Sequence, residues 1–363
     1  MTHKPVLWLE LFFDLIFVAA IAKATHVLLH LEDGVIPIEF LLKFVLIFIP
    51  IWWSWVGHTL YTNRFGEDRL SHRLFMILQM FFMVVLTASL SPDFDSYYMP
   101  FLIGYIGVRL VTSIQYLYTM REVHGEEYQV AKRLGYGFLI GITISLLSLF
   151  FDSWIRYFFL YLGIFVDILV PILSRKHLKK VPVNTPHLLE RFGLLTIILF
   201  GESIVSLVAI FETEGFLWSE VSIIFLAFLL IIAMWWQYFD NLEKKIDKEI
   251  RTSGQIIIYG HLFILMSMSL FAAVIRMSYL YKVDPSFLLL LTFGTAFVYF
   301  LSTTVVFHKY RMPEHRLQVW HLLFFISILV VFLIFNLLIP VEEIVLLSEL
   351  LVFFVIYTYV TTR

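Results

Sequence analysis

Trp8-Leu-Glu-Leu-Phe-Phe-Asp-Leu-Ile-Phe17 and Leu188-Leu-Glu-Arg-Phe-Gly-Leu-Leu-Thr-Ile197 are two versions of one helix start. Each opens a long apolar stretch with Leu-Glu-x-Phe, and the two begin at residues 8 and 188 of a 363-residue chain. This spacing predicts a protein built from two related halves. In each half, a helix that must lie in lipid begins with a carboxylate.

The composition is that of an integral membrane protein. Hydrophobic residues make up 60% of the chain, charged residues make up 15%, and Phe occurs 38 times. Soluble domains are about half apolar and a quarter charged, whereas lipid-facing side chains must also be apolar. The net charge of −2 gives no support to a nucleic-acid partner. The absence of Cys excludes disulfides, thiolate metal sites and Cys nucleophiles.

Twelve apolar stretches are long enough to cross a bilayer, which takes about 20 helical residues. The stretches are residues 6–30, 38–62, 74–90, 98–120, 134–151, 155–174, 190–212, 217–240, 254–280, 286–308, 317–338 and 342–360. We therefore expect an all-α, polytopic protein without an extramembrane domain. The first stretch is too long for a cleavable signal peptide, and no small-residue cleavage site follows it.

Basic residues follow every second span, in clusters that begin at Arg64, Arg121, Arg175, Lys244 and Lys309. The alternate loops are short and mostly acidic or neutral. Because Lys and Arg collect in cytoplasmic loops, this alternation places both termini in the cytoplasm. The expected location is the inner (cytoplasmic) membrane of the cell, with the lipid bilayer as the surrounding partner.

The longest loop divides the chain into six spans plus six. The predicted parts are a first membrane repeat at 1–174, a cytoplasmic linker at 175–189 and a second membrane repeat at 190–363. Trp52-Trp53 in the second span is echoed by Trp235-Trp236 in the eighth. Because each half has an even number of spans, the repeat should be parallel, with its axis along the membrane normal.

Ionisable groups at membrane depth are costly and indicate function by default. Glu10 and Asp14 have i, i+4 spacing and share one helical face. Two carboxylates so close together could bind a cation or relay protons. The alternative is that both are solvated at the cytoplasmic end of the helix, where the helix dipole favours them.

Glu202 lies near the middle of the seventh span, and we expect Gly201 beside it to let another backbone approach. Arg191 lies on the same face, too far along the helix for direct contact, so the two could mark points on one polar path. The alternative is a Glu that is hydrogen-bonded for packing alone. Glu190, from the motif itself, and Ser203 complete the candidates on this helix.

Three candidates lie in other spans. Arg109 in the fourth span must find an anion, for which Asp14, Glu202, Asp167 or a substrate would serve. Asp167, deep in the sixth span, is a candidate in its own right. His261 is either a proton carrier or a core His bonded to a backbone carbonyl. No pattern supports a metal site, and no cofactor is expected.

Two motifs carry a resemblance to a known family. Glu10-Leu-Phe-Phe-Asp14-Leu-Ile-Phe-Val18 and Leu189-Glu-Arg-Phe-Gly193-Leu-Leu-Thr-Ile-Ile-Leu-Phe-Gly-Glu-Ser-Ile204 resemble the bacterial low temperature requirement A family. The resemblance spans most of the chain and implies a multi-pass membrane protein linked by name to growth in the cold, without a settled activity. The matching motif positions are Glu10, Phe13, Asp14, Glu190, Arg191, Gly193, Gly201, Glu202 and Ser203.

These observations favour transport of an ion or small solute through a polar path between the two halves, with proton coupling left open. A cation channel is the alternative. The first motif is also similar to the Phe-Ser-Asp helix of a lysosomal potassium channel family with two six-helix repeats, although Phe13 replaces the Ser. A further alternative is an intramembrane enzyme acting on lipid or isoprenoid, through Glu202, Ser203 and His261. A structural or sensor role and a homo-oligomer also remain open.

Overall fold

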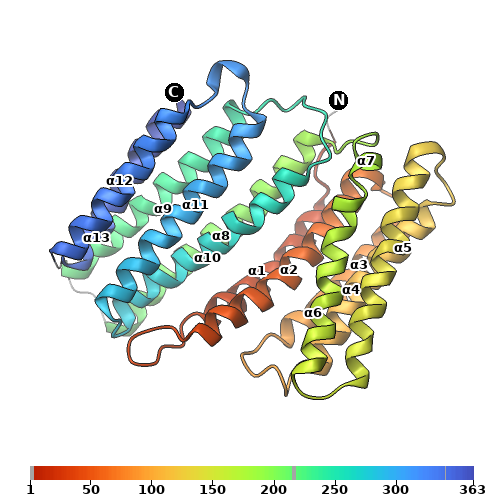
Figure 1. The fold of residues 1–363 in the computed structure, drawn as a ribbon, viewed down its shortest axis with the longest axis horizontal. Coiled ribbons are helices and arrows are strands. Elements are labelled where there is room, and N and C mark those ends of the chain that lie inside the picture. The colour runs from red at the N-terminus through yellow and green to blue at the C-terminus, as the bar shows by residue number, and fades with distance from the viewer. Residues whose placement is uncertain (1–3, 215–217, 340) are drawn as a thin grey trace. The chain divides into compact units, whose positions relative to one another are not determined.

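The computed structural model describes residues 4–214, 218–339 and 341–363, and the chain within these ranges is almost entirely helical (Figure 1). Its α-helices are α1 (Trp8–Val27), α2 (Ile38–Phe65), α3 (Leu70–Ala88), α4 (Tyr98–Thr119), α5 (Gly125–Leu147), α6 (Trp154–Leu173), α7 (Arg175–Leu178), α8 (Thr185–Glu214), α9 (Trp218–Lys244), α10 (Gln255–Leu280), α11 (Pro285–Tyr310), α12 (Val319–Leu338) and α13 (Glu343–Thr362). Short 3-10 turns follow α5 at Ser148–Phe150 and precede α12 at Pro313–His315. No strand occurs in the described ranges, which confirms the all-α fold class.

Each apolar stretch expected from the sequence corresponds to one long helix. The start of the eighth stretch, residue 217, lies outside the described residues. Eleven of the described helices are long and apolar enough to cross a membrane, so the chain is a protein with many membrane spans. Two helices fall outside this set: the four-residue α7, and α1, which carries Glu10, Asp14 and Lys23 along its length. The count of twelve spans stays a prediction.

The chain divides into two compact units. Unit 1 consists of residues 1–24, 45–191 and 249–258, and unit 2 consists of residues 25–44, 192–248 and 259–363. Four helices, α1, α2, α8 and α10, contribute residues to both units. The six-plus-six division along the chain and the parallel repeat stay predictions.

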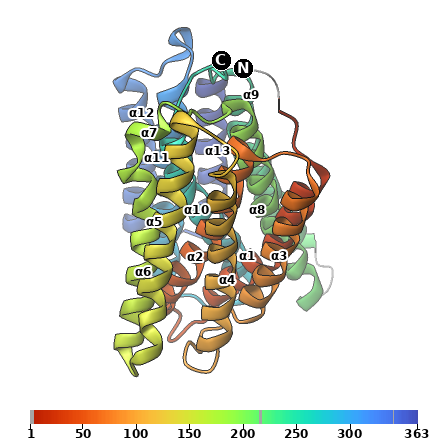
Figure 2. The same cartoon turned by 90° about the vertical axis from the view of Figure 1, so that its right-hand side faces the viewer.

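In unit 1, α3, α4, α5 and α6 pack in sequence order, each against the next (Figure 2). Glycines allow the closest of these contacts. A Cβ on Gly163 of α6 would lie 2.5 Å from the backbone oxygen of Gly141 on α5. A Cβ on Gly104 of α4 would lie 2.5 Å from the backbone nitrogen of Leu86 on α3. Small residues give membrane helices their closest packing, because lipid offers no hydrophobic drive for association.

In unit 2, α13 packs along α9, and α12 contacts α11 and α13. Aromatic rings fill this packing. Phe300 of α11, Phe325 of α12 and Tyr357 of α13 have ring centroids between 5.0 and 5.7 Å apart. Asp284 caps α11, since its Oδ1 accepts a hydrogen bond from the Phe287 backbone N–H at 2.8 Å. Most of α12 remains exposed, as expected for a helix that faces lipid.

Candidate functional site

A buried ion pair within unit 1 joins α1 to the start of α8. The Arg191 guanidinium donates from Nη1 to Asp14 Oδ2 at 2.9 Å and from Nη2 to Asp14 Oδ1 at 2.8 Å. From α2, Trp55 Nε1–H donates to the same Oδ1 at 2.7 Å. Asp14 is 3% exposed and Arg191 is 0% exposed. This two-pronged geometry is what allows both charges to remain away from water.

A second acid–base pair lies one helical turn earlier on both helices. His187 Nε2 lies 3.3 Å from Glu10 Oε2, and both side chains are buried. The residue numbers advance by four on each helix between this pair and the Asp14–Arg191 pair, so α1 and the start of α8 run parallel here. One face of α1 is therefore acidic against one basic face of α8.

Lys4 brings a further positive charge close to Glu10, from the segment that precedes α1. Its Nζ donates to the backbone oxygens of Thr62 and Gly66, the latter at 2.8 Å. Burial lowers the pKa of Lys4 below its ordinary value, while the negative charge of Glu10 opposes that shift. These contacts hold the start of the described chain against the last turns of α2.

Asn63 of α2 connects His187 to the residue that caps α8. Its Nδ2 lies 3.1 Å from His187 Nδ1 and also donates to the Asn184 backbone oxygen at 2.9 Å. Its Oδ1 accepts from the Asn184 backbone N–H at 2.9 Å. The Asn184 side chain in turn accepts from the His187 backbone N–H at 3.2 Å, which is the geometry of a helix N-cap.

A polar chain continues from α2 towards α3 and α4. The His58 ring stacks on Phe13 of α1, with centroids 3.9 Å apart, and its Nδ1 lies 2.8 Å from Gln79 Oε1. Gln79 Nε2 then donates to Thr112 Oγ1 and to Gln115 Oε1, each at 2.9 Å. His58 Nε2 and Arg191 Nε are buried and have no hydrogen-bond partner among the described residues. The described protein groups therefore leave these two nitrogens of the network without a hydrogen bond.

The structure therefore brings together Glu10, Asp14 and Arg191 from the residues predicted from the sequence. Each of the two carboxylates has its own basic partner, which is His187 for Glu10 and Arg191 for Asp14. Sequence reasoning missed His187, although its i, i+4 spacing to Arg191 mirrors that of Glu10 to Asp14. Glu190, the counterpart of Glu10 in the repeated motif, is exposed and does not join this cluster.

Arg109 and Asp167 form a separate buried pair in unit 1. Arg109 Nε donates to Asp167 Oδ2, which also accepts from Trp53 Nε1 at 3.1 Å and from the Tyr105 hydroxyl at 3.2 Å. The Arg109 guanidinium carbon lies 4.4 Å from the ring centroid of Phe138, a cation–π distance. Of the anions considered for Arg109, the structure supplies Asp167. No hydrogen bond from a described residue reaches Arg109 Nη1, Arg109 Nη2 or Asp167 Oδ1.

Glu202 of α8 lies in unit 2 and is 7% exposed. It makes no hydrogen bond to a described residue, and Arg276 of α10 is the charged group that acts on it. The expectation for Gly201 is wrong, because no described atom would lie within 4 Å of a Cβ placed there. Gly201 is on the exposed side of α8, so no backbone approaches it. Ser203 Oγ donates to the Leu199 backbone oxygen of its own helix at 3.3 Å.

His261 of α10 is fully buried in unit 2. Its Nε2 lies 2.8 Å from the Tyr238 hydroxyl, and its ring stacks on Phe192 with centroids 4.3 Å apart. The partner of Nε2 is thus a phenol from α9. Ser203 bonds to the backbone of its own helix and His261 Nε2 bonds to Tyr238, so neither of these bonds pairs the two residues as a nucleophile and its base.

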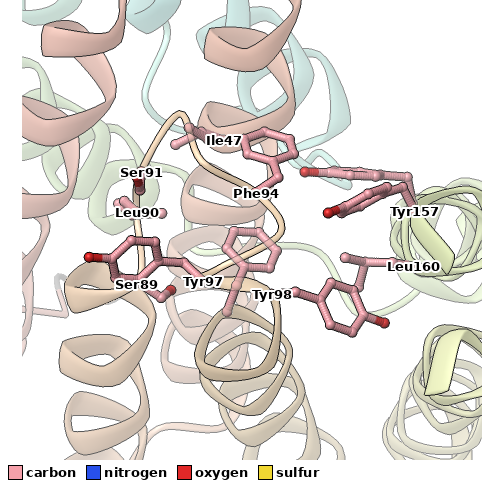
Figure 3. A pocket seen from close by; sticks show the side chains of 11 residues that line it. Ile47, Ser89, Leu90, Ser91, Phe94, Tyr97, Tyr98, Tyr157 and Leu160 are labelled. Carbon is pink, nitrogen blue, oxygen red and sulfur yellow. The ribbon is translucent and has the colours of Figure 1, made fainter. Parts of the chain in front are cut away.

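Two hollows of unit 1 differ in character. A cleft of about 540 Å³ has a polar lining that comprises Asn63, Arg64, His124, Glu126, Glu127, Lys180, Val181, Pro182, Val183 and Asn184. An aromatic pocket between α4 and α6, which includes Tyr97, Tyr98 and Tyr157, has about 20 Å³ of free space, enough for about one water (Figure 3). The polar cleft is thus the one that reaches the candidate site, through Asn63. Among the described residues, no group of three or more His, Asp or Glu side chains is placed to hold a metal ion.

Comparison with known proteins gives a match along nearly the whole chain. The family model described as bacterial low temperature requirement A protein matches residues 5–358. An uncharacterized protein of Rhizobium meliloti (strain 1021) is 26% identical over 271 residues, which are 70% of this chain. The matched region spans 64% of that relative's own length.

Proposed function

The chain belongs to the bacterial low temperature requirement A family, and from that membership and the buried site we propose that it transports a small ion or solute across the membrane in exchange for or together with protons. The membrane would be the inner membrane of the cell, with both termini in the cytoplasm. Asp14 and Glu10 are the groups that bind the proton or the cation; Arg191 is the charge partner of Asp14, and His187 is the hydrogen-bond partner of Glu10.

One observation carries this proposal: two acid–base pairs are buried one turn apart on the facing sides of α1 and α8. Burying ions costs several kcal/mol each, and apolar residues of similar volume would give equal or greater stability. Two such pairs in a membrane helix indicate a function that uses their charge. An acid with a dedicated basic partner can release that partner when a cation or a proton takes its place.

The test is a flux measurement on the purified protein in liposomes loaded with a pH-sensitive dye. Gradients of sodium chloride, potassium chloride and choline chloride are the probes. We expect the lumenal pH to change faster than in protein-free vesicles for at least one probe, and Asp14→Asn to remove the difference. The double variant Asp14→Asn/Arg191→Gln also removes it, without leaving Arg191 as an unpaired buried charge.

Asp240→Asn is the matched control, because Asp240 pairs with Lys244 at an exposed part of α9 and should leave the flux unchanged. Wild-type vesicles that behave like empty ones with every probe overturn the proposal, as does wild-type flux from the double variant. Unitary currents in planar bilayers, far above carrier turnover, would instead identify a channel.

A further inference from the structure

The orientation of the Asn63 amide is set by the backbone of Asn184. Asn63 Oδ1 faces the Asn184 N–H, and Asn63 Nδ2 faces the Asn184 carbonyl oxygen, each at 2.9 Å. Exchanging the two ends of the amide would set donor against donor and acceptor against acceptor. Both bonds would then be lost, so the amide has one stable orientation.

This orientation decides which nitrogen of His187 carries the proton. Asn63 Nδ2 is a donor and lies 3.1 Å from His187 Nδ1, so Nδ1 must be the acceptor and has no hydrogen. His187 Nε2 therefore carries the hydrogen and donates it to Glu10 Oε2 at 3.3 Å. The structure thus assigns a neutral imidazole, fixed as one tautomer by an amide on one side and a carboxylate on the other.

The other charged and titratable groups near His187 come from three elements. Glu10 faces it from α1, with Lys4 beside Glu10. His58 acts on it electrostatically from α2, and Arg191 follows one turn later on α8 itself. A second proton on Nδ1 would thus be attracted by Glu10 and opposed by the cations, and it would meet the N–H of Asn63 directly.

Asn63 also separates the imidazole from the polar cleft. Asn63 and Asn184 line that cleft, whereas His187 does not line it and is 0% exposed. Water in the cleft reaches the Asn63 amide but is kept from His187 Nδ1 by it. An amide has no proton of its own to pass on at neutral pH, so it blocks this route while it stays in place.

We propose that His187 and Glu10 form a proton-loading site and that Asn63 is its gate. When the amide turns aside, a hydronium ion in the water of the cleft gives its proton to His187 Nδ1 and becomes water, and the proton on Nε2 passes to Glu10 Oε2. The imidazole is again neutral, with its hydrogen now on Nδ1, and Glu10 is a neutral acid. The role of this relay in transport depends on the proposed function, whereas the tautomer and its lock do not.

Loading has a structural consequence at the start of α8. The new Nδ1–H cannot face Asn63 Nδ2, so the amide cannot return to the orientation that bonds to Asn184. The N-cap of α8 then loses two hydrogen bonds to α2. Protonation of Glu10 is therefore coupled to loosening of residues 181–185, which also line the cleft in part.

Nitrogen NMR of 15N-histidine-labelled protein in micelles tests the lock directly. The signals that disappear in His187→Gln identify His187. We expect a bare Nδ1 and a protonated Nε2 at pH 7.5 in the wild type. In Asn63→Asp, a carboxylate replaces the donor, and we expect a protonated Nδ1 at the same pH. Asn241→Asp is the control, because Asn241 is buried beside Arg311 and Thr361 in unit 2 and should leave these signals unchanged.

Hydrogen exchange gives the second readout. In Asn63→Asp, the amides of residues 181 and 183–185 should exchange about tenfold faster than in the wild type at pH 7.5. A wild-type His187 with its hydrogen on Nδ1, or unchanged NMR signals and exchange in Asn63→Asp, overturns the inference. If the liposomes show no flux but His187 has the expected tautomer, the transport proposal is overturned and the inference about His187 and Asn63 is not. The two failures are therefore distinguishable.

Discussion

Arg109 and Asp167 show what a buried charge requires at the scale of a single residue. The Arg109 side chain is 0% exposed and the Asp167 side chain is 2% exposed, and a hydrogen bond joins them. The bond between them does not satisfy the remaining N–H groups of Arg109, which lie against the Phe138 ring and the backbone at Gly57. The folded protein can accommodate each of these buried charges only while the other is present.

Asp167→Asn should lower the free energy of unfolding by about 3–5 kcal/mol, because it leaves Arg109 as an uncompensated buried cation. The measurement is thermal unfolding in micelles, followed by intrinsic Trp fluorescence. Arg109→Met/Asp167→Leu, which removes both charges, should recover most of the loss. The control is Asp68→Asn in the exposed pair with Arg73. An Asp167→Asn variant as stable as this control would contradict the account.

Gly57→Ala should also be destabilising, by about 1–3 kcal/mol. A Cβ at this position would lie 2.1 Å from Arg109 Nη1, and the bond to Asp167 prevents the guanidinium from yielding freely. Gly201→Ala is the matched control, since a Cβ there meets no described atom, and its stability should stay within about 1 kcal/mol of wild type. Equal melting temperatures for the two variants would show that Arg109 is free to move.

Individual residues were easier to predict from the sequence than their partners. Glu10, Asp14, Arg109, Asp167 and Arg191 stand out because charges are costly in apolar helices. Their pairing could not be predicted in the same way, because the Asp14–Arg191 contact joins positions that are 177 residues apart in the sequence. The repeated motif aligns Glu10 with Glu190, but the contact is with His187, nearly one turn away. Only the rotation and register of two packed helices decide this, and an apolar pattern does not encode either.

At the scale of elements, the pairing of α5 with α6 depends on small residues. Gly137, Gly141 and Ser145 recur every fourth residue on α5 and form one stripe. Opposite them, a Cβ on Gly163 would lie 2.5 Å from the backbone nitrogen of Ser145. The Ser145 hydroxyl donates to the Leu160 backbone oxygen at 3.0 Å, so a hydrogen bond also crosses between the helices.

Gly163→Ala should force α5 and α6 apart and lower the stability of the protein by about 1–3 kcal/mol. The expected result in thermal unfolding is a reduced melting temperature and faster unfolding in micelles. Gly294→Ala on α11 serves for comparison, because no described atom lies within 4 Å of a Cβ there. If both variants melt together, the α5–α6 contact is looser than the structure indicates.

For the whole molecule, the helices themselves were predictable, because about 20 apolar residues in succession leave few alternatives to a membrane span. The ends of the helices were less predictable. Helix α5 begins at Gly125, whereas its apolar stretch begins at residue 134. The difference arises because the first turns of α5 contain the charged residues Glu126, Glu127, Lys132 and Arg133. Polar turns that extend beyond the lipid carry no hydropathy signal. The orientation in the membrane stays a prediction from the loop charges.

The orientation can be tested directly, because the chain contains no Cys and needs no prior substitution. Asp93→Cys and Lys179→Cys place one thiol on either side of α4, α5 and α6, at exposed positions. In intact cells, a membrane-impermeant maleimide should label the first variant and spare the second. Two further measurements test whether α1 crosses the membrane. If it does, a fluorescent protein fused to the cytoplasmic N-terminus should fluoresce, and the same maleimide should label Asp33→Cys from outside the cell. Equal labelling of Asp93→Cys and Lys179→Cys would contradict the topology.

The charges on α1 have a consequence for biosynthesis. Asp14 leaves the ribosome 177 residues before Arg191, which at 5–20 residues per second is a delay of roughly 10 to 35 s. During that interval the nascent first helix carries acids without their counter-ions, and the translocon would release it into lipid only at a cost of several kcal/mol. If α1 crosses the membrane, we therefore expect its final insertion to follow the synthesis of α8, so that the protein is completed in an order different from the one in which it is translated.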